Sequence, residues 1–264
     1  QWTKQLGSDK TDRGYGVSVD SNNNVYISGY TTGRLDSNTN AYINRADIFL
    51  TKYTESGVKM WTKLLGATSN DYSRGIAIAP NNNMYIAGYT EGDLDGSGNV
   101  GGEDAFLTKY DSNGTLQWTK QLGTAEDDRV YRVATDSNNN VYITGSTKGN
   151  LDGTNAGSLG SNDAFFTKYA DDGTLQWTKQ FGTAPGDIAY DVTTDSNNNV
   201  YITGSTQGDL DGTNAGGNDV FLRKYDSDGT LQWTKQFGST SWDNGMGVSV
   251  DSYNVYFTGT DGTS

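Results

Sequence analysis

The feature that most constrains this chain is an internal repeat of roughly 57 residues. Five tryptophans recur at spacings of 59, 57, 59 and 56 residues, and five aspartates recur at the same four spacings. The tryptophans are Trp2, Trp61, Trp118, Trp177 and Trp233, and the aspartates are Asp12, Asp71, Asp128, Asp187 and Asp243. Two independent markers therefore define one register, which predicts repeat units at about 8–66, 67–123, 124–182 and 183–238.

Each unit contains four segments with the composition of β-strands. In the third unit they are residues 130–136, 141–147, 163–170 and 174–182, which are rich in Val, Ile, Tyr, Phe, Trp and Thr. Turns of Asn, Asp and Gly separate them, and a long polar loop joins the second segment to the third. The apolar runs "VYITG" and "AFFTKY" are typical of strands buried on both faces.

Four strands per unit in tandem predict an all-β chain that folds as a β-propeller of four-stranded blades. A linear β-solenoid is the competing architecture, but its coils are usually shorter and do not form antiparallel hairpins. We expect a single propeller domain over residues 1–264, and we expect it to have five blades. The fifth blade is expected to be shared between the termini, with residues 239–264 and 1–7 contributing. Its third strand would come from residues beyond 264 or from another chain.

The unit "D…G.GVSVDSNNNVYISGYT…LD…DAFLTKYDSNGTLQWTKQLG" resembles the bacterial SBBP-type β-propeller repeat. The resemblance extends from the first residue to about Gly259. It implies a propeller in secreted or cell-surface bacterial proteins, often beside other modules. It implies no enzymatic activity and provides no shared set of catalytic residues. It also suggests seven blades, whereas this chain has four units and a partial one.

Composition narrows the possible functions. The chain has no histidine and no cysteine, which excludes Ser-His-Asp and Cys-His catalysis and the usual zinc sites. The formal net charge of -13 disfavours nucleic acid as a partner, and no apolar run is long enough to cross a membrane. From these absences and the regular repeat, we expect that the protein is not an enzyme.

The loops between the second and third strands carry the candidate metal ligands. Each loop has one aspartate near its start and another at its end, with Asn and Gly between them. The first set is Asp36, Asp95, Asp152 and Asp211, and the second set is Asp47, Asp104, Asp163 and Asp219. Carboxylates, amides and backbone carbonyls are the ligands that Ca²⁺ prefers, so one calcium ion per loop is a possible cofactor. Ordinary turn chemistry, in which these side chains bond nearby N–H groups, is the alternative.

Other recurrent residues have simpler interpretations. The tryptophans of the fourth strands are expected to pack between blades, and the aspartates before the first strands to bond backbone N–H groups of a neighbouring blade. Trp242 has no equivalent in the other units, and Tyr42 lies in a long loop. These two residues are the candidate contacts with a ligand.

The expected function is that of an extracellular or cell-surface structural, adhesion or assembly scaffold. Its partner would be a protein or glycan, and self-association into oligomers or filaments by strand complementation is expected as one route to assembly. The alternative is a lectin-like propeller with one weak carbohydrate site per blade, which would gain strength by avidity.

Overall fold

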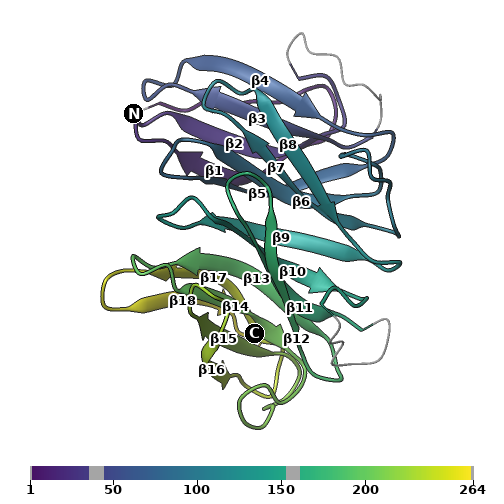
Figure 1. Ribbon diagram of the computed structural model, residues 1–264, viewed down its shortest axis with the longest axis vertical. Helices are drawn as coiled ribbons and strands as arrows, with labels where there is room; N and C mark the ends of the chain where they lie inside the picture. Colours follow the sequence, from purple (N-terminus) through teal and green to yellow (C-terminus); the bar gives the residue numbers. More distant parts are fainter. Residues whose placement is uncertain (1, 36–44, 153–160, 263–264) are drawn as a thin grey trace. The chain divides into compact units, whose positions relative to one another are not determined.

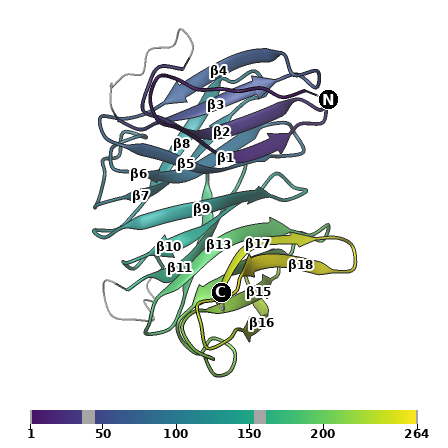
Figure 2. The same cartoon turned by 180° about the vertical axis from the view of Figure 1, so that it is seen from behind.

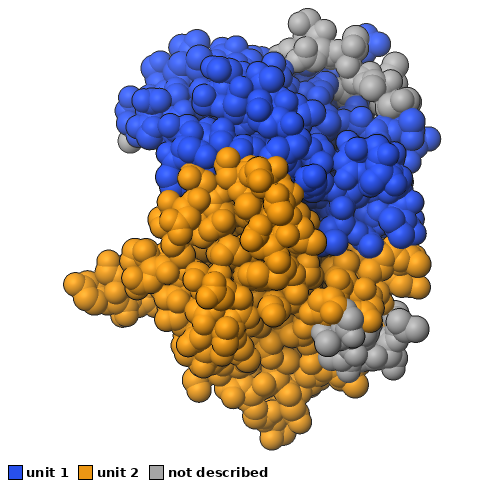
Figure 3. Space-filling view, viewed as in Figure 1, with its two compact units in different colours: residues 1–123 blue, residues 124–264 orange. Residues whose placement is uncertain are grey.

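The computed structural model describes residues 2–35, 45–152 and 161–262, and every regular element among them is a β-strand. The chain divides into two compact units, Gln1–Gly123 and Thr124–Ser264, drawn in blue and orange in Figure 3. The border between them coincides with a predicted repeat border. The single domain stays a prediction. In the described residues, no helix has the length and apolarity that a bilayer crossing requires.

The first unit consists of two four-stranded antiparallel sheets, each in sequence order (Figure 1). The strands of the first sheet are β1 (Asp12–Val19), β2 (Val25–Thr31), β3 (Asp47–Tyr53) and β4 (Lys59–Leu65). Those of the second are β5 (Asp71–Ile78), β6 (Met84–Thr90), β7 (Asp104–Tyr110) and β8 (Leu116–Leu122). The first strand of the second sheet, β5, packs against β1, β2 and β3 of the first.

The second unit repeats this plan and adds a hairpin. Its sheets run in the order β9 (Asp128–Thr135), β10 (Val141–Thr147), β11 (Asp163–Tyr169), β12 (Leu175–Phe181), and then β13 (Asp187–Thr194), β14 (Val200–Thr206), β15 (Asp219–Tyr225), β16 (Leu231–Phe237). A two-stranded sheet follows, formed by β17 (Asn244–Val250) and β18 (Val255–Thr260). It is the yellow hairpin near the C-terminus in Figures 1 and 2. The predicted strands are therefore confirmed, with bounds that differ by one or two residues.

The core of each sheet lies on its second and third strands, as their two-sided apolar pattern predicts. Every residue of β6, β7, β10 and β14 is buried. The fourth strands are more exposed, and their tryptophans pack inward. The Trp177 ring lies 5.0 Å from Phe166 and against the backbone of Gly229 in the next sheet. Packing of these tryptophans between sheets is thus confirmed within each unit.

The shared fifth blade is not formed by the described residues. Residues 2–7 belong to no sheet, and β18 pairs with β17 alone. The coarser prediction, an all-β chain of repeated four-stranded antiparallel sheets, is confirmed.

The turn between the first two strands explains why Asn recurs there. Asp20 accepts N–H groups from Asn22 and Asn24, both at 2.9 Å, and Tyr26 O–H at 2.9 Å. This folds the chain back and leaves Asn23 in the left-handed region, with φ of 60°. Asn82, Asn139 and Asn198 have the same conformation, which Asn tolerates better than most residues.

We predict that Asn23→Gly leaves the free energy of unfolding within about 0.5 kcal/mol of the original, whereas Asn23→Val lowers it by about 1–2 kcal/mol. A β-branched side chain clashes in the left-handed region, and glycine does not. Both variants lose the long 3.4 Å contact from Asn23 to Glu55, so their difference isolates the backbone effect. Urea unfolding measures it, and equal stability of the two variants would contradict the explanation.

Candidate functional site

The recurrent aspartate at the start of each first strand anchors the segment that leads into its sheet. Its carboxylate accepts the backbone N–H of the residue four positions earlier, at 2.6 Å in all five copies. The donors are Ser8, Ala67, Thr124, Thr183 and Ser239. The backbone N–H of Asp71, Asp187 and Asp243 is also bonded, to a carbonyl just before the preceding third strand. The carboxylates therefore bond backbone N–H groups as expected, but the donors belong to the same repeat unit and not to a neighbouring blade.

The aspartate that begins each third strand is also buried, and in three sheets a glutamine of the fourth strand binds it. The Nε2 group of Gln121, Gln180 and Gln236 donates to Asp104, Asp163 and Asp219 at 2.8, 2.8 and 2.9 Å. The Oε1 atom of the same glutamine accepts the N–H of a loop leucine, Leu94, Leu151 or Leu210. One side chain thus ties the long loop to the sheet.

The first aspartates of the predicted calcium loops meet the same glutamines. Asp95 accepts the Gln121 N–H at 2.8 Å, and Asp152 accepts the Gln180 N–H at 2.6 Å. Asp211 lies 3.8 Å from Lys235 at the surface. In the Asp95/Asp104 and Asp152/Asp163 loops, the two aspartates therefore accept N–H groups of the same fourth-strand glutamine. No cluster of three or more acidic residues suited to a metal occurs in the described ranges. Asp36 and Tyr42 lie outside the described residues.

The first sheet departs from this scheme at Asp47. Its fourth strand has Leu64 where the other sheets have glutamine, so the amide donor is absent. Asp47 is 2% exposed, and neither of its carboxylate oxygens has a hydrogen-bond partner in the described structure. A buried carboxylate without donors is costly, which marks this position as unlike its three equivalents.

Asp71 lies beside Asp47. A Cβ atom built on Gly66 would lie 2.3 Å from Asp47 Oδ1 and 3.2 Å from Asp71 Oδ2, so both carboxylates converge on this glycine. Asp71 is fully buried and accepts Thr90 Oγ1–H and the Ala67 N–H. Burial, and then the charge of Asp71, raises the pKa of Asp47 to about 6. Burial also raises the pKa of Asp71 to about 6. The hydrogen bonds from Thr90 and Ala67 lower this pKa, and the charge of Glu91 raises it further.

An aromatic and basic cluster on the first and second strands of the first unit was missed by the sequence reasoning. The Arg74 guanidinium lies 4.5 Å from the Tyr15 ring centroid and 5.1 Å from that of Tyr89, to whose hydroxyl it donates. Tyr30 and Tyr72 extend the cluster, with centroids 4.9 Å apart. The available signal was the third residue after each recurrent Asp, which is tyrosine at Tyr15, Tyr131 and Tyr190 and arginine at Arg74.

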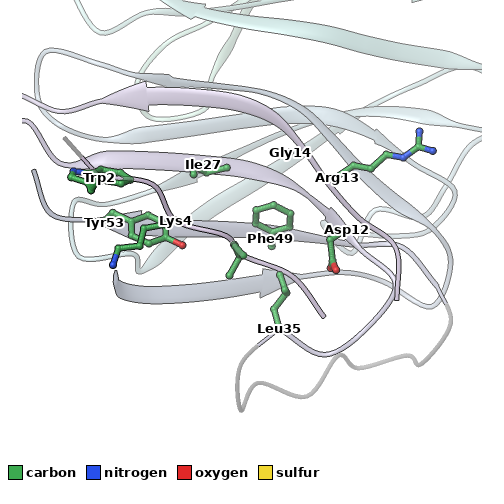
Figure 4. A pocket seen from close by; sticks show the side chains of 10 residues that line it. Trp2, Lys4, Asp12, Arg13, Gly14, Ile27, Leu35, Phe49 and Tyr53 are labelled. Atoms are coloured by element: carbon green, nitrogen blue, oxygen red, sulfur yellow. The ribbon is translucent and has the colours of Figure 1, made fainter. Parts of the chain in front are cut away.

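A small cavity lies between residues 2–6 and the first sheet (Figure 4). Its volume is about 200 Å³, and Trp2, Leu35, Phe49 and Tyr53 line it, with the carboxylate of Asp12 at one end. Ligand pockets usually measure roughly 300–1,000 Å³, so this space is small for an organic ligand. Trp242, the other predicted contact, is 61% exposed on the loop before β17. Its role in ligand binding stays a prediction.

The model of a family described as "Beta-propeller repeat" (SBBP) matches residues 1–36, 61–95, 117–152 and 176–211, together more than half of the chain. Regulatory protein FlaEY of Caulobacter vibrioides is 30% identical over 194 residues, which cover 69% of this chain and 20% of that protein. An uncharacterized WD repeat-containing protein of Acanthamoeba polyphaga mimivirus is 27% identical over 229 residues, 69% of this chain and 16% of that protein. The chain thus spans a fifth or less of the length of these curated relatives.

Among solved structures, the WD40 domain of Neurospora crassa Pan2 matches with 12% identity and a TM-score of 0.45, covering 86% of this chain and 66% of that one. A gluconolactonase of Xanthomonas campestris matches with 13% identity and a TM-score of 0.44, covering 96% and 84%. A catalytically inactive virginiamycin B lyase of Staphylococcus aureus matches with 11% identity and a TM-score of 0.39, covering 97% and 95%.

Two of these matches correct the expectation that the protein is not an enzyme. The gluconolactonase and the lyase are enzymes, so a propeller fold by itself does not exclude catalysis, and the expectation is withdrawn. At these identities the matches show the fold alone and assign no reaction to this chain.

We predict that Gln180→Leu lowers the free energy of unfolding of the second unit by about 1–3 kcal/mol, because it removes the donor from buried Asp163 and the acceptor from Leu151. Gln176→Leu on the same strand is the matched control, since this side chain is exposed and bonds only Thr174 O at 3.4 Å. Denaturant unfolding gives both values. A similar cost for the two variants would refute the role of Gln180.

The Asp47–Asp71 pair predicts that the first unit loses stability as the pH rises. Both folded-state pKa values, about 6, exceed the ordinary value of 3.8. Their contribution is therefore fully present below about pH 4 and is lost as the pH rises through 6. We expect Asp47→Asn to remove roughly 1–3 kcal/mol of the stability difference between pH 5 and pH 7.5 in a low-salt buffer free of divalent cations. An unchanged pH profile in Asp47→Asn would contradict this.

Proposed function

This chain belongs to the SBBP beta-propeller repeat family, and on that premise we propose that it is an assembly module that accepts a further strand on its β17–β18 sheet. The observation that carries the proposal is the exposure of β18. Its equivalents β6, β10 and β14 each have a strand on both sides and are fully buried. β18 has one neighbour and is exposed or half-buried throughout.

The exposed residues of β18 are those that the other sheets bury. Tyr256 is 54% exposed and Phe257 is 44% exposed, whereas the matching Tyr142 and Ile143 are 0% and 1% exposed. Burial of an aromatic side chain of this size contributes about 1.5–3 kcal/mol. A strand that covered both residues would therefore bind through apolar contacts as well as through backbone hydrogen bonds.

The occupant that this edge fits is a third strand of the same repeat. In each complete sheet, the third strand begins with Asp and continues with a run of three apolar residues, as in "DAFFTKY" of β11. A groove beside β18, lined by Val220, Phe237 and Phe257, leaves room for such apolar side chains. The Phe237 and Phe257 rings, with centroids 4.8 Å apart, form its apolar floor.

The proposal includes a fifth blade, in which the added strand would have residues 2–7 as its outer neighbour. Trp2 supports this. Its indole lies against Gly57 of the first sheet and donates to Glu55 O at 2.8 Å. Trp61, a fourth-strand tryptophan, lies against Gly114 of the second sheet in the same way. Residues 2–7 thus occupy the position of a fourth strand relative to the first sheet.

A labelled peptide with the sequence of residues 162–170 tests the proposal. We expect saturable binding to the purified chain by fluorescence anisotropy, and at least tenfold weaker binding to Phe257→Asp, because the aspartate would be buried without a partner. Tyr253→Asp is the matched control, because Tyr253 is 93% exposed in the turn before β18. A scrambled peptide controls for composition.

Two outcomes would overturn the proposal: absence of binding by the peptide, or equal binding to the original chain and to Phe257→Asp. Sedimentation without peptide distinguishes the source of the strand. A dimer that the peptide dissociates indicates donation by a second copy, and a monomer that binds the peptide indicates another segment or partner.

A further inference from the structure

In the first unit, the carboxylates of Asp47 and Asp71 converge on Gly66, and Asp47 receives no hydrogen bond from the described residues. The two residues begin strands β3 and β5, which lie in different sheets and pack against each other. Their carboxylates approach Gly66 from two sides, and both residues are at least 98% buried, with exposures of 2% and 0%. Two buried carboxyl groups therefore lie close together at this position.

The donors available to this pair are few. Asp71 receives Thr90 O–H and the Ala67 N–H, and Asp47 receives none from the described residues. No ion pair joins a lysine or arginine to either carboxylate in the described ranges. The charge of Glu91 adds repulsion to Asp71, and Glu91 itself accepts a hydrogen bond from Asn70 Nδ2–H at 2.9 Å.

A second pair in the protein shows what the usual solution is. Asp163 and Asp187 converge on Gly182 in the second unit, at 2.8 and 2.7 Å from a Cβ atom built there. In that pair, Gln180 donates to Asp163 at 2.8 Å. The first unit keeps the two carboxylates and has Leu64 in place of the glutamine.

We propose that Asp47 and Asp71 together bind a divalent cation of the Ca²⁺ type, which takes the place of the amide donor that the other sheets use. Asp47 Oδ1 and Asp71 Oδ2 converge on Gly66, and neither oxygen of Asp47 accepts a hydrogen bond from the described residues. Hard oxygen ligands of this kind favour Ca²⁺ over softer metals. The site lies at the junction of two sheets, so the cation would hold β5 to β3.

Thermal unfolding at pH 8 tests the site, because both carboxyl groups are then ionised. With KCl holding the ionic strength constant, 1 mM Ca²⁺ should raise the melting temperature of the first unit by roughly 3–8 °C relative to EDTA. Calorimetric titration should give one site per chain beyond any weak surface binding. Mg²⁺, which demands stricter octahedral geometry, should act less strongly.

Three variants distinguish Ca²⁺ binding at the Asp47–Asp71 pair from Ca²⁺ binding to acidic residues on the surface. Asp47→Asn should abolish the calcium shift. Leu64→Gln should reduce it at least twofold and raise the melting temperature in EDTA, because it restores the amide donor. Asp9→Asn, an exposed aspartate of the same unit, should leave the shift unchanged.

The proposal is overturned if Ca²⁺ causes no shift in the original chain, or if the shift is the same in Asp47→Asn. It is also overturned if the unit is stabilised only by lowering the pH below 6, since the pair then holds a proton and no metal. Circular dichroism of each variant in EDTA at pH 5 establishes that it is folded before the comparison.

Discussion

A carboxylate that accepts the N–H group four residues before it is the interaction on which each sheet of this protein depends. All five copies have the same donor position and the same 2.6 Å distance. A charged acceptor makes this bond stronger than a neutral one. It fixes the short segment that connects the fourth strand of one sheet to the first strand of the next, and so it fixes where that first strand begins. The same hydrogen bond therefore recurs at the start of every sheet.

The same anchor creates the electrostatic problem of the structure. It buries an aspartate close to the aspartate that begins the preceding third strand, as Asp71 lies near Asp47 and Asp187 near Asp163. Two buried like charges need donors, a proton or a cation. Gln180 provides a donor in one case, while Leu64 does not in the other. This difference between repeats leaves both oxygens of Asp47 without a donor among the described residues, whereas Asp163 keeps Oδ2 hydrogen-bonded to Gln180.

The lysines of the third strands show how much tertiary packing alters a simple expectation. Lysine side chains are usually exposed, and Lys52 and Lys168 follow Thr in strands of an acidic protein. Lys52 is instead 7% exposed, stacks on Tyr26 at 5.0 Å and donates to Ser112 O in the next sheet. Lys168 donates to Ser227 O at 2.7 Å. These side chains hold the hairpin of the neighbouring sheet within each unit.

The sequence by itself determined the number of repeats, the four strands of each, the turns and the buried second and third strands. These depend on local patterns: alternation, turn residues and a spacing that two markers share. Only the tertiary structure decided that Asp47 meets Asp71, that Gln180 serves Asp163, and that β18 keeps an exposed edge. Each of these depends on which strands lie side by side, and the 23 residues between Asp47 and Asp71 carry no local signal of their approach.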